Sequence, residues 1–447
     1  MAGANAAVTD ATRSAETLEW LADRARANRC SVTRIPFAEM DAWSFQPGTG
    51  NLVHDSGRFF AVEGIRVDDD NGPRATQPIL NQPEIGILGL LTQKAGGVRR
   101  YLVQAKMEPG NVNTMQLAPT VQATRSNYMR VHGGRSTVYL EHFRGSGRGR
   151  PLVDVLQSEQ GSWFLRKRNR NMVVETAGDV PDHEDFRWMT RDEIHELLSV
   201  DNLAGMDIRT VLSCLPAERP RTAPYDEFTE ALRRSYDRAA PARCTPAEIL
   251  SWFTEARSRC DWRVTSIPLR DVPSWTVGAD EVAEEGGRRF RITGRRVVAE
   301  RREVTSWAQP LLEPLSIGLA AFLARPIDGV LHVLVRARPQ AGLPDLVEIG
   351  PTVQTQADEP DPADPLAAEA RTENPGRVRF DTVLSEEGGR FFHARTRYRL
   401  IDVGRDFPLD VPPDHCWLTV RQLMDLVRHK HYLNVEARTL LACTHSL

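Results

Sequence analysis

The sequence contains an internal repeat. Residues 32–36 (VTRIP) recur as residues 264–268 (VTSIP), a separation of 232 residues. The same separation relates residues 119–122 (PTVQ) to residues 351–354 (PTVQ), and further along the chain it shortens to 229, which relates Trp188 to Trp417. Similar separations recurring over so many segments indicate two homologous halves. The fold must therefore contain one module twice.

The repeat sets the predicted domain boundaries. We predict a first domain over residues 15–215 and a second domain over residues 245–447. Proline residues in segment 216–244 predict a linker, within which residues 225–237 could form one helix. Residues 1–14 are predicted to be disordered. The acidic, proline-rich insertion at 357–377 is predicted to be a mobile loop of the second domain.

Both halves show the same order of elements. A helix opens each half, and in the second half residues 245–248 (TPAE) form a capping box with proline at the first helical position. Strand-like apolar runs follow, such as residues 85–91 and 317–323. A second capped helix closes each half, after Thr190 and after Thr419. The predicted fold class is mixed α/β (α+β), present as two tandem domains.

Composition excludes several classes of protein. The 57 basic and 60 acidic residues nearly cancel, to a net charge of −3, so no basic field for nucleic acid is present. The sequence contains no apolar run of ~18 residues, the length that a membrane-spanning helix needs. The N-terminus lacks the pattern of a signal peptide. Six cysteines without zinc-type spacing are expected to be reduced thiols. We therefore expect a soluble, cytoplasmic protein.

The sequence lacks the common cofactor and catalytic motifs. It contains no GxxxxGK[ST] phosphate loop, no complete GxGxxG after a strand, no GxSxG and no HExxH. His429 and His431 are more typical of a solvated helix end than of a metal site. We therefore predict an enzyme or binding protein that needs no cofactor and no metal.

One signature appears in both halves. Residues 154–161 (DVLQSEQG) and 382–389 (TVLSEEGG) resemble the REUxEExG core of the Nudix box. In Nudix hydrolases these carboxylates hold the divalent metals that activate water. The leading Arg-Glu pair is missing from both segments, and the first segment keeps only Glu159. A capped surface helix ending in glycine would match equally well. The recurrence favours two Nudix-like domains that have lost the hydrolytic metal site.

Polar side chains are concentrated in residues 104–141 of the first half. A cluster of cations and amides around strand ends suits a diphosphate with attached hydroxyl groups, and a solvated strand edge is the alternative. The second half provides an internal control, because there Lys106 becomes Arg338 and Glu108 becomes Gln340, whereas Gln122 persists as Gln354. Residues confined to the first half are therefore the better candidates for chemistry.

These segments resemble the NDP-hexose 2,3-dehydratases of deoxysugar biosynthesis. The resemblance rests on residues 49–60 (TGNLVHDSGRFF), 104–128, and 133–143 (GGRSTVYLEHF), together with the duplicated architecture. It implies two Nudix-like domains per subunit, a homodimer and the substrate dTDP-4-keto-6-deoxy-D-glucose. It also implies products that feed the synthesis of 2,6-dideoxysugars in antibiotics and other natural products. The second half lacks many of the polar residues, which argues against a second active site.

The implied chemistry is a redox-neutral elimination. The C3 hydrogen of a 4-keto sugar is acidic because it is α to the carbonyl. A base removes it, the enolate charge rests on the C4 oxygen, and the C2 hydroxyl leaves with a proton from an acid. The resulting enol tautomerises to a 3,4-diketo-2,6-dideoxy sugar. The protein must supply a base, an oxyanion stabiliser and an acid.

The first half offers candidates for each role. Glu108 or His54 is the expected base, and Lys106 or Arg130 is expected to stabilise the C4 oxygen. Tyr128 or Tyr139 is the expected donor to the leaving hydroxyl. The expected substrate-binding residues are Arg125 and Arg135 for the pyrophosphate, Trp43 for thymine unless it is a core residue, and Asn51, Ser56, Asn111, Gln116, Gln122, Thr124 and Glu141. The corresponding pocket of the second half is expected to contain Trp275, Arg338 and Gln354.

Two other functions fit parts of the sequence. A Mg²⁺-dependent Nudix hydrolase would cleave the nucleotide-sugar diphosphate, although the degenerate box argues against it. A non-catalytic nucleotide-sugar sensor would keep the pocket without the chemistry. A 3-ketoreductase is a chemically reasonable functional partner of a dehydratase, because a 3,4-diketo sugar is reactive.

Overall fold

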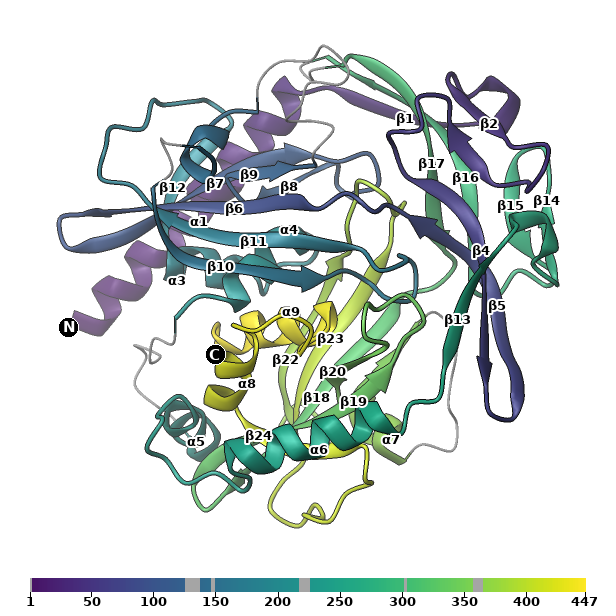
Figure 1. Ribbon diagram of the computed structural model, residues 1–447. Coiled ribbons are helices and arrows are strands. Elements are labelled where there is room, and N and C mark those ends of the chain that lie inside the picture. The colour runs from purple at the N-terminus through teal and green to yellow at the C-terminus, as the bar shows by residue number, and fades with distance from the viewer. Residues whose placement is uncertain (1, 125–136, 146–148, 217–225, 301–303, 357–364) are drawn as a thin grey trace.

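The computed structural model describes residues 2–124, 137–145, 149–216, 226–300, 304–356 and 365–447 (Figure 1). Over these residues the strands form two seven-stranded and two five-stranded sheets. Tyr128, Arg130, Arg125 and Arg135 lie outside the described residues. In the described part of the chain, no helix is long and apolar enough to cross a membrane.

The two seven-stranded sheets have matching topologies. In the first, the order is β10-β11-β6-β7-β12, with β8 on β7 and β9 on β6. In the second, it is β20-β19-β18-β23-β22, with β21 on β18 and β24 on β19. Each sheet has one parallel pair, β6 with β11 and β18 with β23. The matching sheets agree with a duplicated mixed α/β module. Their bounds are β6 (Gly86–Ala95), β7 (Val98–Met107), β8 (Met115–Ala118), β9 (Val121–Ala123), β10 (Arg150–Ser158), β11 (Arg168–Glu175), β12 (Phe186–Thr190), β18 (Gly318–Ile327), β19 (Val330–Pro339), β20 (Val347–Pro351), β21 (Val353–Thr355), β22 (Val378–Ser385), β23 (Arg395–Asp402) and β24 (His415–Thr419).

The two halves exchange their first strands. Strand β1 (Cys30–Ile35) of the first half pairs with β16 (Phe290–Ala299) of the second half. Conversely, β13 (Arg263–Ile267) of the second half pairs with β4 (Ala61–Asp69) of the first half (Figure 1). The recurring VTRIP and VTSIP segments are these two strands. The remaining strands of the two five-stranded sheets are β2 (Trp43–Phe45), β3 (Leu52–His54), β5 (Gly72–Asn81), β14 (Trp275–Val277), β15 (Glu281–Glu284) and β17 (Ser306–Pro314).

The halves are also joined at two equivalent turns. The N–H group of Gly110 donates to the carbonyl oxygen of Gly388 at 2.7 Å, and that of Gly342 donates to the carbonyl oxygen of Gly161 at 2.7 Å. A Cβ atom at Gly110 would stand 1.7 Å from the carbonyl oxygen of Phe391. Only glycine permits so close a backbone approach. Each half therefore completes a sheet and a turn of the other.

Helices cover the sheets and meet at the centre. The capping boxes predicted before α3 (Arg191–Leu197), α6 (Pro246–Ser258) and α8 (Val420–Leu426) are confirmed. Helix α4 (Met206–Ser213) contacts α9 (Val435–Thr444), where Arg438 Nε donates to Thr210 Oγ1 at 2.8 Å. Three short 3₁₀ helices are η1 (Phe37–Glu39), η2 (Leu140–Phe143) and η3 (Leu269–Asp271).

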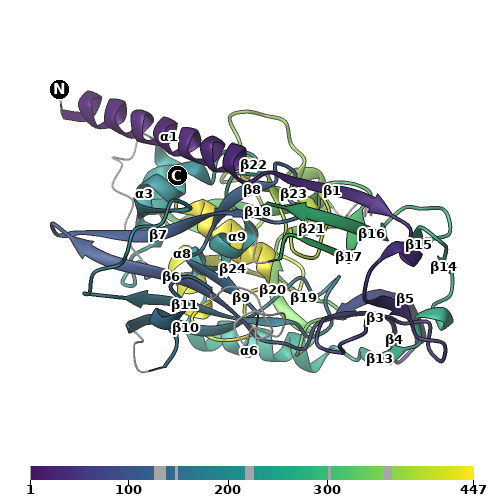
Figure 2. The ribbon, with the colours of Figure 1, turned by 90° about the horizontal axis from the view of Figure 1, so that it is seen from above.

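The N-terminal segment, the linker and the acidic insertion each contain a helix. Helix α1 (Ala2–Ala27) includes the first residues, for which the sequence predicted disorder, and it contacts β7, β8 and α3 (Figure 2). The linker contains helix α5 (Glu227–Ser235). The described end of the acidic insertion forms α7 (Pro365–Ala370).

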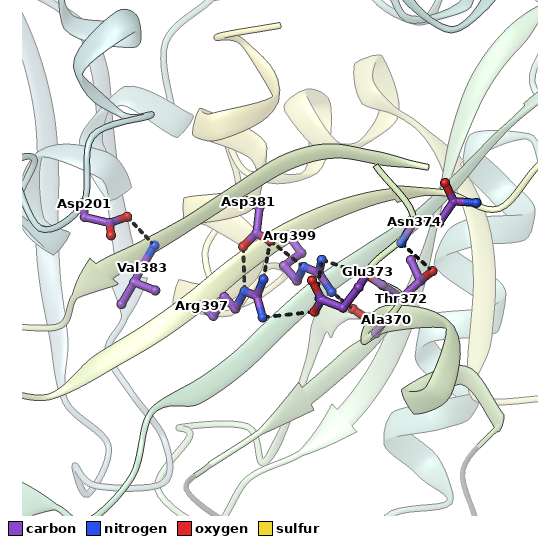
Figure 3. Close-up of polar contacts among 9 residues, drawn as sticks. All are labelled: Asp201, Ala370, Thr372, Glu373, Asn374, Asp381, Val383, Arg397 and Arg399. Atoms are coloured by element: carbon purple, nitrogen blue, oxygen red, sulfur yellow. Dashed lines mark hydrogen bonds and ion pairs between the residues drawn. The ribbon is translucent and has the colours of Figure 1, made fainter. Parts of the chain in front are cut away.

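The end of the acidic insertion is held by a buried arginine. Arg399 of β23 donates to the carbonyl oxygens of Ala370 at 2.7 Å and Thr372 at 2.8 Å (Figure 3). Its Nε atom also donates to Asp381 at 3.1 Å. A charged group without water needs such partners. Residues 370–372 are therefore fixed to the sheet, where the sequence predicted a mobile loop.

Glu348 of the second half forms a buried contact with Ser158 of the first half, and this contact can be tested by changing the pH. The Glu348 side chain is fully buried in β20 and accepts a hydrogen bond from Ser158 Oγ at 2.6 Å. Burial raises the pKa of Glu348 to about 7. The folded protein therefore holds this proton to higher pH than the unfolded chain, so folding is favoured at low pH and loses stability as the pH rises from about 4.5 through 7.

The variant Glu348→Gln cannot ionise, so we expect it to remove this pH-dependent penalty. Its gain in unfolding free energy should be up to ~3 kcal/mol at pH 8 and much smaller at pH 5. Thermal unfolding measured at both pH values checks this. A stability change that is the same at both values would contradict the role assigned to ionisation.

Candidate active site

A cavity of about 520 Å³ lies where the first seven-stranded sheet meets β17 and the turn after β22. Both halves of the chain therefore contribute to its walls. First-half side chains at the cavity include Trp43, His54, Phe59, Phe60, Gln82, Lys106, Glu108, Gln122, Thr124, Lys167, Asn169 and Asp207. Those from the second half include Trp307, Gln309, Glu387 and Arg390.

The cavity brings together six of the residues predicted from the sequence: Trp43, His54, Lys106, Glu108, Gln122 and Thr124. At its wall the Lys106 ammonium lies 3.3 Å from Glu108 Oε1. Lys106 Nζ also donates to the main-chain oxygen of Gln122 at 3.1 Å. Lys106 is the last but one residue of β7, and Glu108 follows that strand directly. An adjacent cation and carboxylate at a cavity wall can stabilise an enolate and accept a proton.

The rings of Trp43, His54 and Phe59 form another part of the cavity. The His54 ring lies 4.4 Å from that of Phe59 and 5.3 Å from that of Trp43. His54 Nδ1 accepts from the Ser56 N–H at 3.2 Å and lies 2.8 Å from Ser56 Oγ. Ser56 therefore orients the imidazole ring without lining the cavity itself. Trp43 is 7% exposed and donates to the Ala308 carbonyl oxygen at 3.0 Å, so its indole is also a core residue.

Other predicted residues lie elsewhere. Asn51 Oδ1 accepts from the Leu269 N–H at 2.9 Å and so joins the two halves. Tyr139 is buried, with its hydroxyl donating to the Pro181 carbonyl oxygen and its ring against Phe186. Glu141 is exposed on η2. None of these three is among the residues at the cavity.

Asn111 and Gln116 lie beside the main cavity. They line a small adjoining cavity of about 20 Å³, together with Lys106, Glu108 and Asp207. Asn111 Nδ2 donates to the Thr114 carbonyl oxygen at 3.2 Å, and Gln116 Nε2 donates to Ser385 Oγ at 2.9 Å. Both amides therefore support the wall behind the Lys106–Glu108 pair.

Sequence reasoning missed the second-half residues of the cavity. Glu387 and Arg390 follow β22, in a turn that reaches the first half. Arg390 Nε donates to Gln82 Oε1 at 3.1 Å, and its guanidinium lies 4.4 Å from the centre of the Phe60 ring. Trp307 and Gln309 come from β17, with Trp307 Nε1 donating to Gln309 Oε1 at 3.0 Å. The equivalent hydrogen bonds Gly110–Gly388 and Gly342–Gly161 make Gln160 and Trp163 the first-half counterparts of Glu387 and Arg390. This pairing is one residue out of register with the sequence match of residues 154–161 to 382–389, which pairs Glu387 with Glu159.

Two carboxyl groups at the cavity have raised pKa values. Burial, followed by the negative charges of neighbouring carboxylates, raises the pKa of Asp207 well above its ordinary value. Burial and the Glu108 charge also raise the pKa of Glu387, against the opposing effect of Arg390 and Lys167. Burial lowers the pKa of Lys167, whose ammonium donates to the Glu84 carbonyl oxygen. These shifts favour the protonated forms of Asp207 and Glu387 beside the Lys106–Glu108 ion pair.

The equivalent cavity of the second half is much smaller, about 20 Å³. Gln160 and Trp163, from the equivalent turn of the first half, occupy the places of Glu387 and Arg390. Gln354 lines this cavity and accepts from Asn434 Nδ2 at 2.8 Å. Arg338 lies on β19 outside it, and Trp275 packs 4.7 Å from Phe290 in the core. Glu387 and Arg390 are thus replaced by uncharged side chains here, although Glu386, Arg395 and Glu436 also line this cavity.

The segments that resemble a Nudix box are not helical. Residues 154–158 belong to β10 and residues 382–385 to β22, and each strand leads into one of the exchanged turns. The signature therefore does not lie on a capped surface helix, which was the alternative to a degenerate Nudix box. Among the described residues, no group of three or more His, Cys, Asp or Glu side chains is placed to hold a metal ion.

Comparisons with known proteins agree with this duplicated architecture. A family model described as NDP-hexose 2,3-dehydratase matches residues 14–215 and again residues 246–444. A relative from Amycolatopsis orientalis, named dTDP-4-dehydro-6-deoxy-alpha-D-glucopyranose 2,3-dehydratase, is 47% identical over 98% of this chain and 92% of its own length. Relatives of the same name from Streptomyces violaceoruber and Saccharopolyspora spinosa are 49% and 47% identical, each over 96% of this chain and over 96% and 90% of their own lengths. The chain belongs to the NDP-hexose 2,3-dehydratase family.

Proposed function

We propose that this protein is a dTDP-4-dehydro-6-deoxyglucose 2,3-dehydratase of deoxysugar biosynthesis. It eliminates the C2 hydroxyl of dTDP-4-keto-6-deoxy-D-glucose and forms a 3,4-diketo-2,6-dideoxy sugar. The observation that carries the proposal is the Lys106–Glu108 pair, 3.3 Å apart, in a large cavity of a chain 47–49% identical to named 2,3-dehydratases.

The Lys106–Glu108 pair supplies the first step. Glu108 removes the C3 proton, and the Lys106 ammonium stabilises the negative charge that develops on the C4 oxygen. The side chains of both residues are only 13–14% exposed, so water screens their charges weakly. His54 is the less suitable base, because its Nδ1 atom already accepts a hydrogen bond from Ser56.

The substrate orientation follows from the two parts of the cavity. Lys106, Glu108, Asp207 and Glu387 also line the small adjoining cavity, whereas the aromatic residues do not. The sugar therefore binds at the charged part. The thymine base binds near Trp43 and Trp307, since aromatic faces favour stacking on a flat base.

The elimination transfers no electrons out of the substrate, so it requires no nicotinamide. The family resemblance supports two Nudix-like domains per subunit and a homodimer. Light scattering of the purified protein would test the homodimer. The reactive 3,4-diketo product supports functional coupling to a 3-ketoreductase.

The decisive experiment incubates EDTA-treated protein with dTDP-4-keto-6-deoxy-D-glucose in D₂O, followed by mass spectrometry. Loss of water without added metal or nicotinamide is expected. Deuterium should be found in the product after the product has been trapped by chemical reduction. Cleavage at the diphosphate after Mg²⁺ addition would instead identify a Nudix hydrolase. Binding without any reaction would identify a sensor.

A further inference from the structure

The second half contributes a carboxyl group to the cavity of the first half. Glu387 follows β22 and reaches the cavity because of the exchanged turn. We propose that Glu387 is the catalytic acid that protonates the C2 hydroxyl as it leaves. This inference rests on the proposed dehydratase function and assigns its second proton transfer.

The geometry places Glu387 next to the proposed base. Glu387 Oε1 lies 3.0 Å, and Glu108 Oε2 lies 3.2 Å, from the point where a Cβ atom on Gly389 would stand. Because Gly389 has no side chain, the two carboxyl groups face the same small space at the cavity wall. Neighbouring atoms of one ligand can therefore contact both carboxyl groups.

The turn that carries Glu387 is held on both sides. The Gly388 carbonyl oxygen accepts from the Gly110 N–H at 2.7 Å, and the Gly110 carbonyl oxygen accepts from the His393 N–H at 2.7 Å. Gln309 Nε2 donates to the Gly389 carbonyl oxygen at 2.8 Å. Before Glu387, the Glu386 N–H donates to the Ala394 carbonyl oxygen at 2.9 Å. The backbone is therefore fixed on either side of Glu387, as a group acting in proton transfer requires.

Neighbouring carboxyl groups suit the stereochemistry of this substrate. In a gluco-configured ring, the C3 hydrogen and the C2 hydroxyl lie on the same face. A base and an acid for their removal must therefore approach from one side of the sugar. Glu108 and Glu387 meet this requirement because they face the same space, although they come from different halves.

The proton balance closes without a further reactant. Glu108 takes the proton when the C3–H bond breaks, and Glu387 gives its proton to the C2 oxygen when the C2–O bond breaks, releasing water. Tautomerisation then removes a proton from the C3 hydroxyl and adds one at C2. These two transfers restore the protonation states of Glu387 and Glu108. Burial and the Glu108 charge raise the pKa of Glu387, which favours the protonated form that this role needs.

The test separates the two proton transfers. With Glu387→Gln, we expect water loss to slow by ~10²–10⁴-fold. Exchange of the C3 hydrogen of the substrate with D₂O should continue, because Glu108 and Lys106 are intact. Rates of both processes can be followed by NMR on one sample.

A second substrate tests the acid role specifically. The 2-deoxy-2-fluoro analogue of the substrate loses fluoride, which needs no proton to leave. Glu387→Gln should therefore release fluoride from this analogue at close to the wild-type rate, measured with a fluoride electrode. A merely structural role of Glu387 would slow fluoride loss and water loss alike.

Matched variants complete the design. Glu348→Gln makes the same change at a buried glutamate outside the cavity, and it should leave both processes unchanged. Wild-type water loss by Glu387→Gln, or its failure to exchange C3 hydrogen and release fluoride, would overturn the inference. If the wild-type protein neither exchanges C3 hydrogen nor loses water, the proposed function itself fails.

Discussion

Glu108→Gln is expected to lower turnover of dTDP-4-keto-6-deoxy-D-glucose by ~10²–10⁴-fold. The amide cannot accept the C3 proton, although it retains the shape of the carboxylate and its position 3.3 Å from Lys106. Exchange of the C3 hydrogen with D₂O should be lost together with water elimination. NMR of the substrate in D₂O measures both losses.

His54→Gln serves as the comparison for that result, because His54 is the alternative base at the same cavity. We expect this variant to keep C3 exchange. If His54→Gln abolishes exchange while Glu108→Gln preserves it, the roles of the two residues are reversed. Substrate affinity, measured by calorimetry, should remain in both variants.

Gly110→Ala is expected to damage both stability and catalysis. The new Cβ atom would stand 1.7 Å from the Phe391 carbonyl oxygen, so the backbone of the exchanged turn must move. Such overpacking costs about 1–3 kcal/mol, and more when backbone atoms collide. The displaced turn carries Glu387 and Arg390, so turnover should also fall. Thermal unfolding and the dehydration assay measure the two effects.

Gly342→Ala is the matched control for Gly110→Ala. Its Cβ atom would stand 1.8 Å from the Phe164 carbonyl oxygen, at the equivalent turn beside the small second cavity. We expect a similar loss of stability, with turnover retained below the unfolding temperature. Equal losses of turnover in the two variants would show that the turn with Glu387 has no special place in catalysis.

The repeat predicted much of the fold. Capping boxes such as that at Thr190 depend on local sequence, and the structure confirms them. The strand exchange could not be predicted, because residues 32–36 and 264–268 resemble one another so closely. Each of these strands has the side-chain pattern to pair within its own half or with the other, and pattern alone does not choose between them.

Comparison of the two halves also predicted part of the candidate site. Lys106 and Glu108 lie at the end of β7 and Gln122 lies on β9, and both strands pair with β6. Comparison of the halves distinguished the first two residues. Glu387 and Arg390 were missed because the comparison assumed that each half supplies its own pocket. Tyr139 was misleading because the sequence does not distinguish a buried tyrosine, whose hydroxyl bonds to the main chain, from a tyrosine that binds substrate.

The exchanged strands also determine when this protein can fold. As the chain leaves the ribosome, the edge of β4 remains without its neighbour until β13 has been synthesised, and β1 waits still longer for β16. Pairings between such distant segments form slowly. Nascent first halves therefore expose unpaired strand edges, the surfaces through which incomplete chains associate wrongly. The active-site cavity can be completed only after residues 304–309 and 387–390 of the second half have been synthesised.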